Sequence, residues 1–113
     1  MVNNQTLKQL QASASHGDFY WTEFIESNQD IRKSPVFIIG SRDHEDIIVC
    51  SCTRHPARTE YDILIQLKQP TCVRTNKIYI VRRAQLINKI NVNLQTHEYV
   101  EVMDKFKKAL HLV

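Results

Sequence analysis

The strongest constraint on the fold is a series of short apolar runs, rich in β-branched and aromatic residues, that recur between polar clusters. Such runs, bounded by turn-forming residues, are typical of β-strands. None approaches the roughly 20 apolar residues that a membrane-spanning helix needs, and the polar start of the chain lacks the apolar region of a secretory signal. The pattern therefore predicts a mainly β protein that is cytoplasmic and makes no contact with a membrane.

Five strands are predicted, at residues 18–25, 35–40, 47–53, 60–67 and 72–81. The second and third are almost continuously apolar, which is typical of strands covered on both faces or rolled tightly around a core. The fourth alternates, with Asp62 among the residues expected to face water. Residues 82–89 are interpreted as a short helical turn, whose Arg82 and Arg83 we expect to be solvated.

Two helices complete the prediction. A short helix, capped by Asn3 or Asn4, runs through Gln11. A longer helix follows Thr96, because apolar residues return there at helical spacing and form one stripe that we expect to pack on the core. The stripe comprises Tyr99, Val102, Met103, Phe106, Leu110 and Val113.

Together these elements indicate an α+β protein, mainly β, in which helices pack outside a small, strongly bent antiparallel sheet or barrel. A chain of 113 residues is the size of one ordinary domain. We expect a single domain over residues 1–113, with an N-terminal helical extension at 1–15 and a C-terminal helix at 95–112.

The cysteines and the known sequence motifs limit the chemistry. Cys50, Cys52 and Cys72 are odd in number and lack C-x-x-C spacing, which predicts buried free thiols instead of a metal or redox site. No P-loop, dinucleotide fingerprint, nucleophile elbow or H-E-x-x-H helix occurs. We therefore expect no cofactor and no bound metal. The formal net charge of +3 permits a nucleic-acid partner without requiring one.

Positive charge and hydroxyl groups gather at the ends of the two most apolar runs. Arg32 and Lys33 precede the second predicted strand, and Thr53 ends the third, where alternation places it on the same face as Ser51. Because a simple turn joins these strands, the start of one meets the end of the other. The loop after Thr53 adds Arg54, His55 and Arg58.

The chemistry of this cluster suits an anionic phosphodiester. Guanidinium groups bind phosphate oxygens bidentately, a threonine hydroxyl adds a neutral donor, and histidine exchanges protons near neutral pH. The alternative is that these short loops are charged only because they face water. With no evident metal cage, cleavage would need a nucleophile carried by the substrate, and RNA has one in its 2′-hydroxyl.

The order of the segments resembles the PemK/MazF-like family of toxin–antitoxin ribonucleases. The matching segments are GDFYWTEF, SPVFIIG, IIVCSCT, CVRTNKIYIVRRAQL and the closing NLQTHEYVEVMDKFKKAL. The resemblance implies an SH3-like antiparallel barrel of the CcdB/PemK type with appended helices, which forms a homodimer and binds a cognate antitoxin. It also implies a metal-independent endoribonuclease that cuts single-stranded RNA, including mRNA, to a cyclic phosphate and a 5′-hydroxyl.

The resemblance also implies roles for two residues. Arg32 would stabilise the charged phosphorane and Thr53 would hold the scissile phosphate. His55 is included because it lies two residues after Thr53. From there it would act as acid or base. The alternative is an exposed or structural role. The expected substrate-binding residues are Lys33, Ser51, Arg54 and Arg58.

Two departures from the family pattern keep other functions open. Ser34, instead of arginine, directly precedes Pro35, and the family's G-x-E-Q-x-G loop is replaced by IESNQDI. One alternative is a gyrase-inhibiting, CcdB-like toxin that acts through its terminal helix. The other is a catalytically inactive RNA-binding or regulatory relative.

Overall fold

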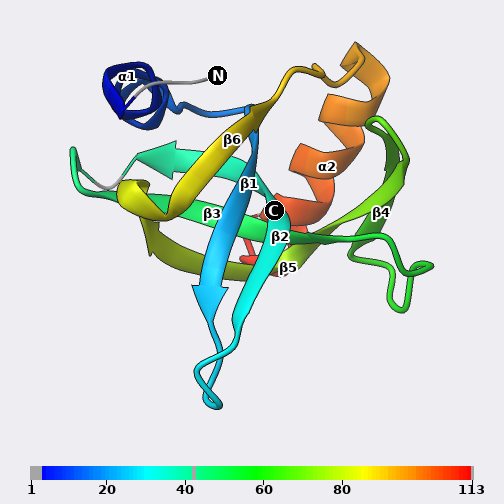
Figure 1. Ribbon diagram of the computed structural model, residues 1–113. Helices are drawn as coiled ribbons and strands as arrows, with labels where there is room; N and C mark the ends of the chain where they lie inside the picture. The colour runs from blue at the N-terminus through cyan, green and yellow to red at the C-terminus, as the bar shows by residue number, and fades with distance from the viewer. Residues whose placement is uncertain (1–3, 42, 113) are drawn as a thin grey trace.

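The computed structural model describes residues 4–41 and 43–112 and shows a curled, antiparallel six-stranded sheet with a helix at each end of the chain (Figure 1). The strand order is β4-β5-β3-β2-β1-β6, so within the described residues the sheet has two edges and is not a closed barrel. The predicted α+β, mainly β architecture is confirmed.

The elements are α1 (Asn4–Ser13), β1 (Phe19–Ile25), β2 (Ile31–Ser41), β3 (Asp46–Thr53), β4 (Asp62–Gln66), β5 (Pro70–Arg82), the 3-10 helix η1 (Arg83–Gln85), β6 (Leu86–Ile90) and α2 (Thr96–Ala109).

β2 begins at Ile31, not at Pro35 as predicted. The early residues of β2 pair with β1, from Ile31 opposite Ile25 to Pro35 opposite Trp21. Pro35 is tolerated inside the strand because the ladder to β3 starts only at the next residue, Val36. Arg32 and Lys33 are therefore strand residues held in register, not loop residues.

The prediction of five strands missed β6. Of the expected helical turn at residues 82–89, only η1 is helical, and the chain then adds a strand to the free edge of β1. Leu86 and Ile90, at the two ends of this strand, are buried. Asn88 and Lys89, between them, are polar and exposed. The segment therefore lacks the apolar alternation by which a strand is predicted from sequence.

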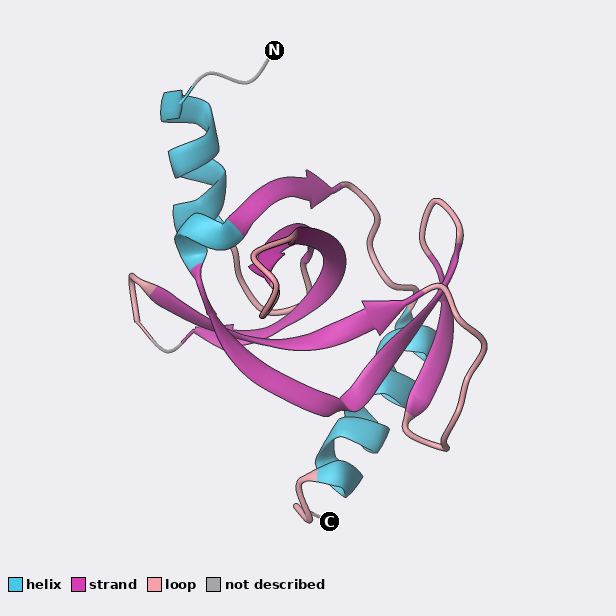
Figure 2. Cartoon of the chain, turned by 60° about the horizontal axis from the view of Figure 1, so that its bottom comes forward, coloured by secondary structure: helices cyan, strands magenta, loops and turns pink. Residues whose placement is uncertain are grey.

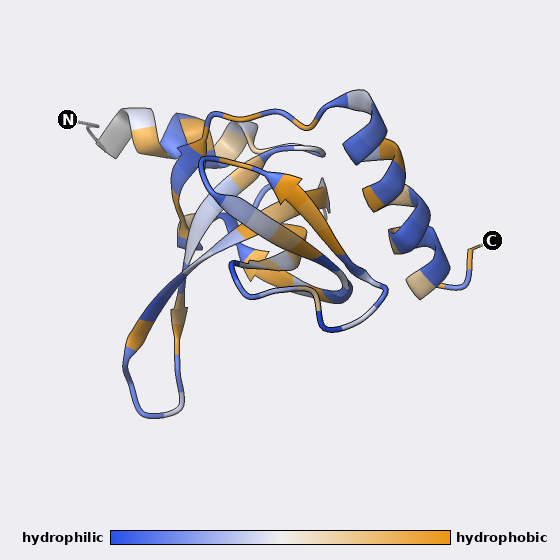
Figure 3. Cartoon of the chain, turned by 90° about the vertical axis from the view of Figure 1, so that its right-hand side faces the viewer, coloured by the Kyte–Doolittle hydropathy of each residue, from blue (hydrophilic) through white to orange (hydrophobic). Residues whose placement is uncertain are grey.

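The two core clusters lie on opposite faces of the sheet. Phe19, Phe37 and Cys50 belong to one cluster. The residues next to them along the three strands, including Tyr20 and Val49, belong to the other. This confirms the prediction of strands covered on both faces. The strands curve around the interior in Figure 2, and in Figure 3 the β1–β2 hairpin projects from the body and is mainly hydrophilic.

A break in the pairing of β3 with β5 makes the sheet turn sharply. Cys50 pairs with Ile78 and Cys52 with Val73, so residues two apart in β3 face residues five apart in β5. The extra residues of β5 form a bulge, which raises the local twist. Arg74 lies at this bulge and pairs with Asp62 of β4.

The C-terminal stripe is only partly core. Val102 is buried, but Tyr99 and Leu110 are 36% and 44% exposed. Met103 and Phe106 are half-buried, and Val113 lies outside the described residues. The helix contacts β5 and β4 from outside the sheet, as predicted.

The N-terminal helix is held by a residue that was predicted to be solvated. Arg83 is buried, and its Nη1 donates to the carbonyl oxygens of Gln11 and Ala14, each at 2.9 Å. Its Nε donates to the carbonyl oxygen of Asp43 at 3.3 Å. The helix extends beyond Gln11 to Ser13, and the proposed cap Asn3 lies outside the described residues.

The three cysteines are free and buried, as predicted. Among the described residues, no helix has the length and apolar character required to span a bilayer.

Candidate active site

One pocket of about 480 Å³, where the β2–β3 ladder opens, contains all the site residues predicted from the sequence. The described residues that line this basic pocket include no acidic side chain. They come from β1, β2, β3, β5 and the loop after β3. The lining residues are Trp21, Arg32, Lys33, Ser34, Pro35, Ser51, Cys52, Thr53, Arg54, His55, Arg58 and Arg74.

Strand alternation places the arginine and the hydroxyl groups on one face. Ser51 pairs directly with Val36, so residues two and four positions before Val36 lie on the same face as Ser51 and Thr53. Those residues are Ser34 and Arg32. Arg32 lies two residues before Ser34, the position directly before Pro35. A shift of two residues keeps a side chain on the same face of a strand, so Arg32 stays on the face of Ser34 but lies roughly 7 Å farther along the strand.

The guanidinium of Arg32 is held by two contacts within the β1–β2 hairpin. Its Nε lies 2.9 Å from Oε1 of Glu26, and its Cζ lies 4.9 Å from the centre of the Phe24 ring. The side chain remains 53% exposed. Stacking on one face and pairing through Nε leave the terminal nitrogens to donate to a ligand.

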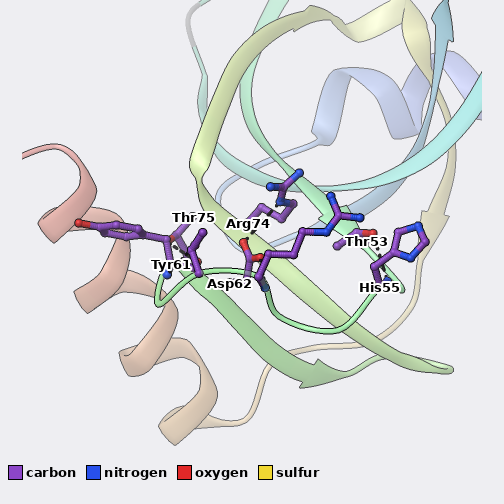
Figure 4. Close-up of polar contacts among 8 residues, drawn as sticks. Thr53, His55, Tyr61, Asp62, Arg74 and Thr75 are labelled. Atoms are coloured by element: carbon purple, nitrogen blue, oxygen red, sulfur yellow. Dashed lines mark hydrogen bonds and ion pairs between the residues drawn. The ribbon is translucent and has the colours of Figure 1, made fainter.

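A turn that follows β3 fixes the hydroxyl of Thr53. Thr53 Oγ1 accepts a hydrogen bond from the backbone N–H of His55 at 3.2 Å, and Figure 4 shows the two residues side by side. Because the oxygen accepts this bond, its own proton can be donated to a ligand in the pocket. His55 is exposed at the rim, in the turn that Pro56 continues, so β3 does not carry it on.

The sequence reading missed Asp62 and Arg74. Asp62 was expected to face water, but its side chain is 1% exposed. Its carboxylate accepts from the Arg58 backbone N–H at 2.9 Å and from Nε of Arg74 at 3.4 Å (Figure 4). Asp62 thus ties the loop after β3 to β5 and holds Arg74 at the pocket. Only the β4–β5 register brings the two charges together, and no local sequence signal reveals it.

A second contact joins β5 to the residue that precedes β4. Thr75, which follows Arg74, donates from Oγ1 to the carbonyl oxygen of Tyr61 at 2.7 Å (Figure 4). The backbone N–H of Thr75 donates to the same oxygen at 3.0 Å. The bulge of β5 is therefore anchored at Arg74 and at Thr75.

The buried groups beside the pocket stay neutral. Burial raises the pKa of Cys52 well above its usual value, so this lining residue is a thiol and not a thiolate nucleophile. Burial also raises the pKa of Tyr79, while a hydrogen bond with Ser51 and the charge of Arg32 act in the opposite direction. Within the described ranges, no three His, Cys, Asp or Glu side chains are placed to share a metal ion.

The chain is a small curled antiparallel sheet with a C-terminal helix, and a basic pocket lies between β2 and the end of β3. Among solved structures, MazF-type toxins have this fold. No protein-family profile matches the sequence. No curated protein matches it either.

Several MazF-type structures superpose on most of the chain. The MazE–MazF complex from Deinococcus radiodurans matches with a TM-score of 0.75 at 12% identity, over 88% of this chain and 97% of the other. A mycobacterial endoribonuclease in complex with its cognate antitoxin matches with a TM-score of 0.72 at 11% identity, over 89% and 98%. The Mycobacterium tuberculosis toxin MazF-mt6 matches with a TM-score of 0.67 at 13% identity, over 83% and 96%.

Proposed function

We propose that this protein is the toxin of a toxin–antitoxin pair and acts as an endoribonuclease on single-stranded RNA, including mRNA, in the cytoplasm. The observation that carries the proposal is the convergence of Arg32 and Thr53 on one basic pocket. The MazF-type fold supports it, because solved relatives of that fold are endoribonucleases and toxins.

The proposed reaction uses the substrate's own nucleophile. The 2′-oxygen of the RNA forms a bond to the adjacent phosphorus while the bond from phosphorus to the 5′-oxygen breaks. The 2′-hydroxyl loses a proton and the departing 5′-oxygen gains one. The products are a 2′,3′-cyclic phosphate and a free 5′-hydroxyl, and the reaction needs no metal ion and no cofactor.

The pocket residues have distinct roles in this mechanism. The terminal nitrogens of Arg32 donate to the non-bridging oxygens as negative charge builds on the phosphorane. The Thr53 hydroxyl donates to the scissile phosphate and fixes its position. His55, exposed at the rim, transfers protons to or from the reacting oxygens.

Three further basic residues and one serine bind the rest of the strand. Lys33, Ser51, Arg54 and Arg58 lie around Arg32 and Thr53 in the same pocket, where they would contact the neighbouring phosphates. Each released counterion contributes to affinity, so binding should weaken steeply with salt. The same charge would attract the acidic tail of a cognate antitoxin, and we further propose that the toxin is a homodimer.

The test is RNA cleavage in excess chelator. Purified protein should cut single-stranded RNA to fragments ending in a cyclic phosphate and a 5′-hydroxyl, identified by mass spectrometry. Arg32→Ala and Thr53→Ala should each lower the rate on the order of 100-fold or more, because each removes a donor to the developing charge. Lys107→Ala removes an exposed charge from α2, outside the basic pocket, and should leave the rate unchanged.

Three results would contradict the proposal in different ways. Cleavage that survives both substitutions would reject this site. RNA binding without any cleavage would indicate a catalytically inactive relative, in keeping with the Ser34 departure. No activity on RNA, together with growth arrest that follows loss of DNA supercoiling, would indicate a gyrase inhibitor.

A further inference from the structure

A smaller hollow of about 150 Å³ adjoins the basic pocket and shares Trp21, Pro35 and Arg54 with it. Leu67 and Ile90 add apolar wall, and Gln69 adds an amide group. The hollow therefore combines apolar surface with hydrogen-bonding groups, and it lies directly beside the pocket proposed to bind phosphate.

The shared wall is flat and rigid. Trp21 and Pro35 pair directly across β1 and β2, so the indole and the proline ring lie on the same face of the ladder. Trp21 is half-buried and packs against the core cluster that contains Phe19 and Phe37. A ring fixed in this way loses little conformational freedom when a ligand stacks on it.

Arg54 lies at the boundary between the two hollows. Its Cζ is 5.9 Å from the centre of the Trp21 ring, and its side chain lines both of them. The guanidinium lies over the indole face, where it provides a positive charge for a phosphate and a second planar group for an aromatic ring.

We propose that this hollow is a subsite for one nucleobase of the RNA strand, which stacks on Trp21 while Gln69 contacts the edge of the base. The inference rests on the proposed function, because it needs an RNA strand whose phosphates occupy the basic pocket. Single-stranded RNA is recognised by bases that leave the stack and lie on aromatic side chains, with polar groups at their edges. A nucleotide beside the bound phosphate places its base next to that phosphate, where this hollow lies.

The protein contains one tryptophan, so its indole fluorescence reports on Trp21 alone. The probe is a short single-stranded RNA with 2′-fluoro sugars, which lack the attacking hydroxyl and cannot be cut. We expect this strand to change the fluorescence on binding. Strands with one abasic residue, placed at each position in turn, should identify a single position where affinity falls on the order of 10-fold and the fluorescence change is lost.

Two variants separate stacking from a folding defect. Trp21→Phe keeps a flat ring and should retain most of the affinity, measured by anisotropy of labelled RNA. Trp21→Ala should bind the intact strand on the order of 10-fold more weakly, yet bind the abasic strand as the wild type does. A thermal unfolding curve establishes that each variant is folded, and Gln69→Ala should change the preference among the four bases at that one position.

The outcomes distinguish this inference from the proposed function. If RNA is bound and cut but no abasic position matters and the indole signal does not change, the subsite is wrong and the nuclease stands. If Trp21→Ala weakens the intact and abasic strands equally, stacking on Trp21 is wrong. If neither binding nor cleavage of RNA is seen, both proposals fail.

Discussion

At the residue scale, the site depends on how charged side chains are held. Arg32 is anchored by Phe24 and Glu26, and Arg74 by the buried carboxylate of Asp62. The sequence predicted that Arg32 and Thr53 would meet, because a simple turn joins their strands, although it placed Arg32 in a loop instead of in β2. It gave the wrong environment for Asp62, because the partner Arg74 comes from another strand and depends on register.

The pair of Arg32 with Glu26 makes a prediction about substrate binding. Glu26→Gln removes a negative charge that competes with phosphate for the guanidinium. RNA affinity should increase roughly 2- to 5-fold, and the free energy of unfolding should change by less than about 0.5 kcal/mol, because both side chains are about half exposed. Fluorescence anisotropy and urea unfolding measure the two effects.

A matched charge change far from the site is the control. Glu101→Gln alters an exposed residue of α2 and should leave RNA affinity unchanged. If Glu26→Gln instead slows cleavage, then Glu26 orients Arg32 or takes part in proton transfer, and the competition argument is wrong.

At the scale of elements, the secondary structure of a segment depends on which other elements it can pair with. Residues 86–90 form β6 because β1 has a free edge, and η1 turns the chain so that it can reach that edge. The same turn carries Arg83 under the end of α1, where its donors meet the terminal carbonyl groups. A cation at the carbonyl end of a helix also interacts favourably with the helix dipole.

Adjacent arginines give a matched test of this contact. Arg83→Ala leaves the carbonyl oxygens at the end of α1 without their donor and should lower the free energy of unfolding by about 2–4 kcal/mol. Arg82→Ala removes an exposed side chain and should cost less than about 0.5 kcal/mol. Urea unfolding measures both, and hydrogen exchange should show loss of protection in α1 for Arg83→Ala alone. Equal effects of the two variants would show that the buried contact does not hold α1.

At the scale of the whole molecule, stability comes from two clusters that share the central strands β1, β2 and β3. The first cluster includes Cys50 and Cys52, whose small side chains lie where the sheet turns sharply. Burial raises the pKa of Cys50 from 9.0 to about 12, and it also raises the pKa of Cys52.

These shifts predict a loss of stability in alkali. The folded thiols stay protonated while an unfolded thiol ionises near pH 9, so stability is complete below that pH and falls as pH rises toward 12. Each buried thiol should contribute up to about 1.4 kcal/mol per pH unit above the unfolded pKa. Urea unfolding at a series of pH values should show a shallower decline for Cys50→Ala than for the wild type. A decline of equal slope would mean that Cys50 ionises freely in the folded state.

The sequence by itself determined the features that depend on neighbours along the chain. These are the runs that become strands, the faces their side chains share, the long C-terminal helix, and the meeting of Arg32 with Thr53 across a simple turn. Local alternation and turn chemistry are sufficient for them. Only the tertiary structure decided the pairing of Asp62 with Arg74, the addition of β6 to β1, the burial of Arg83, and the hollow beside Trp21. Each of these depends on register and packing between segments far apart in the sequence, where the free energy of a contact is set by partners that no local pattern encodes.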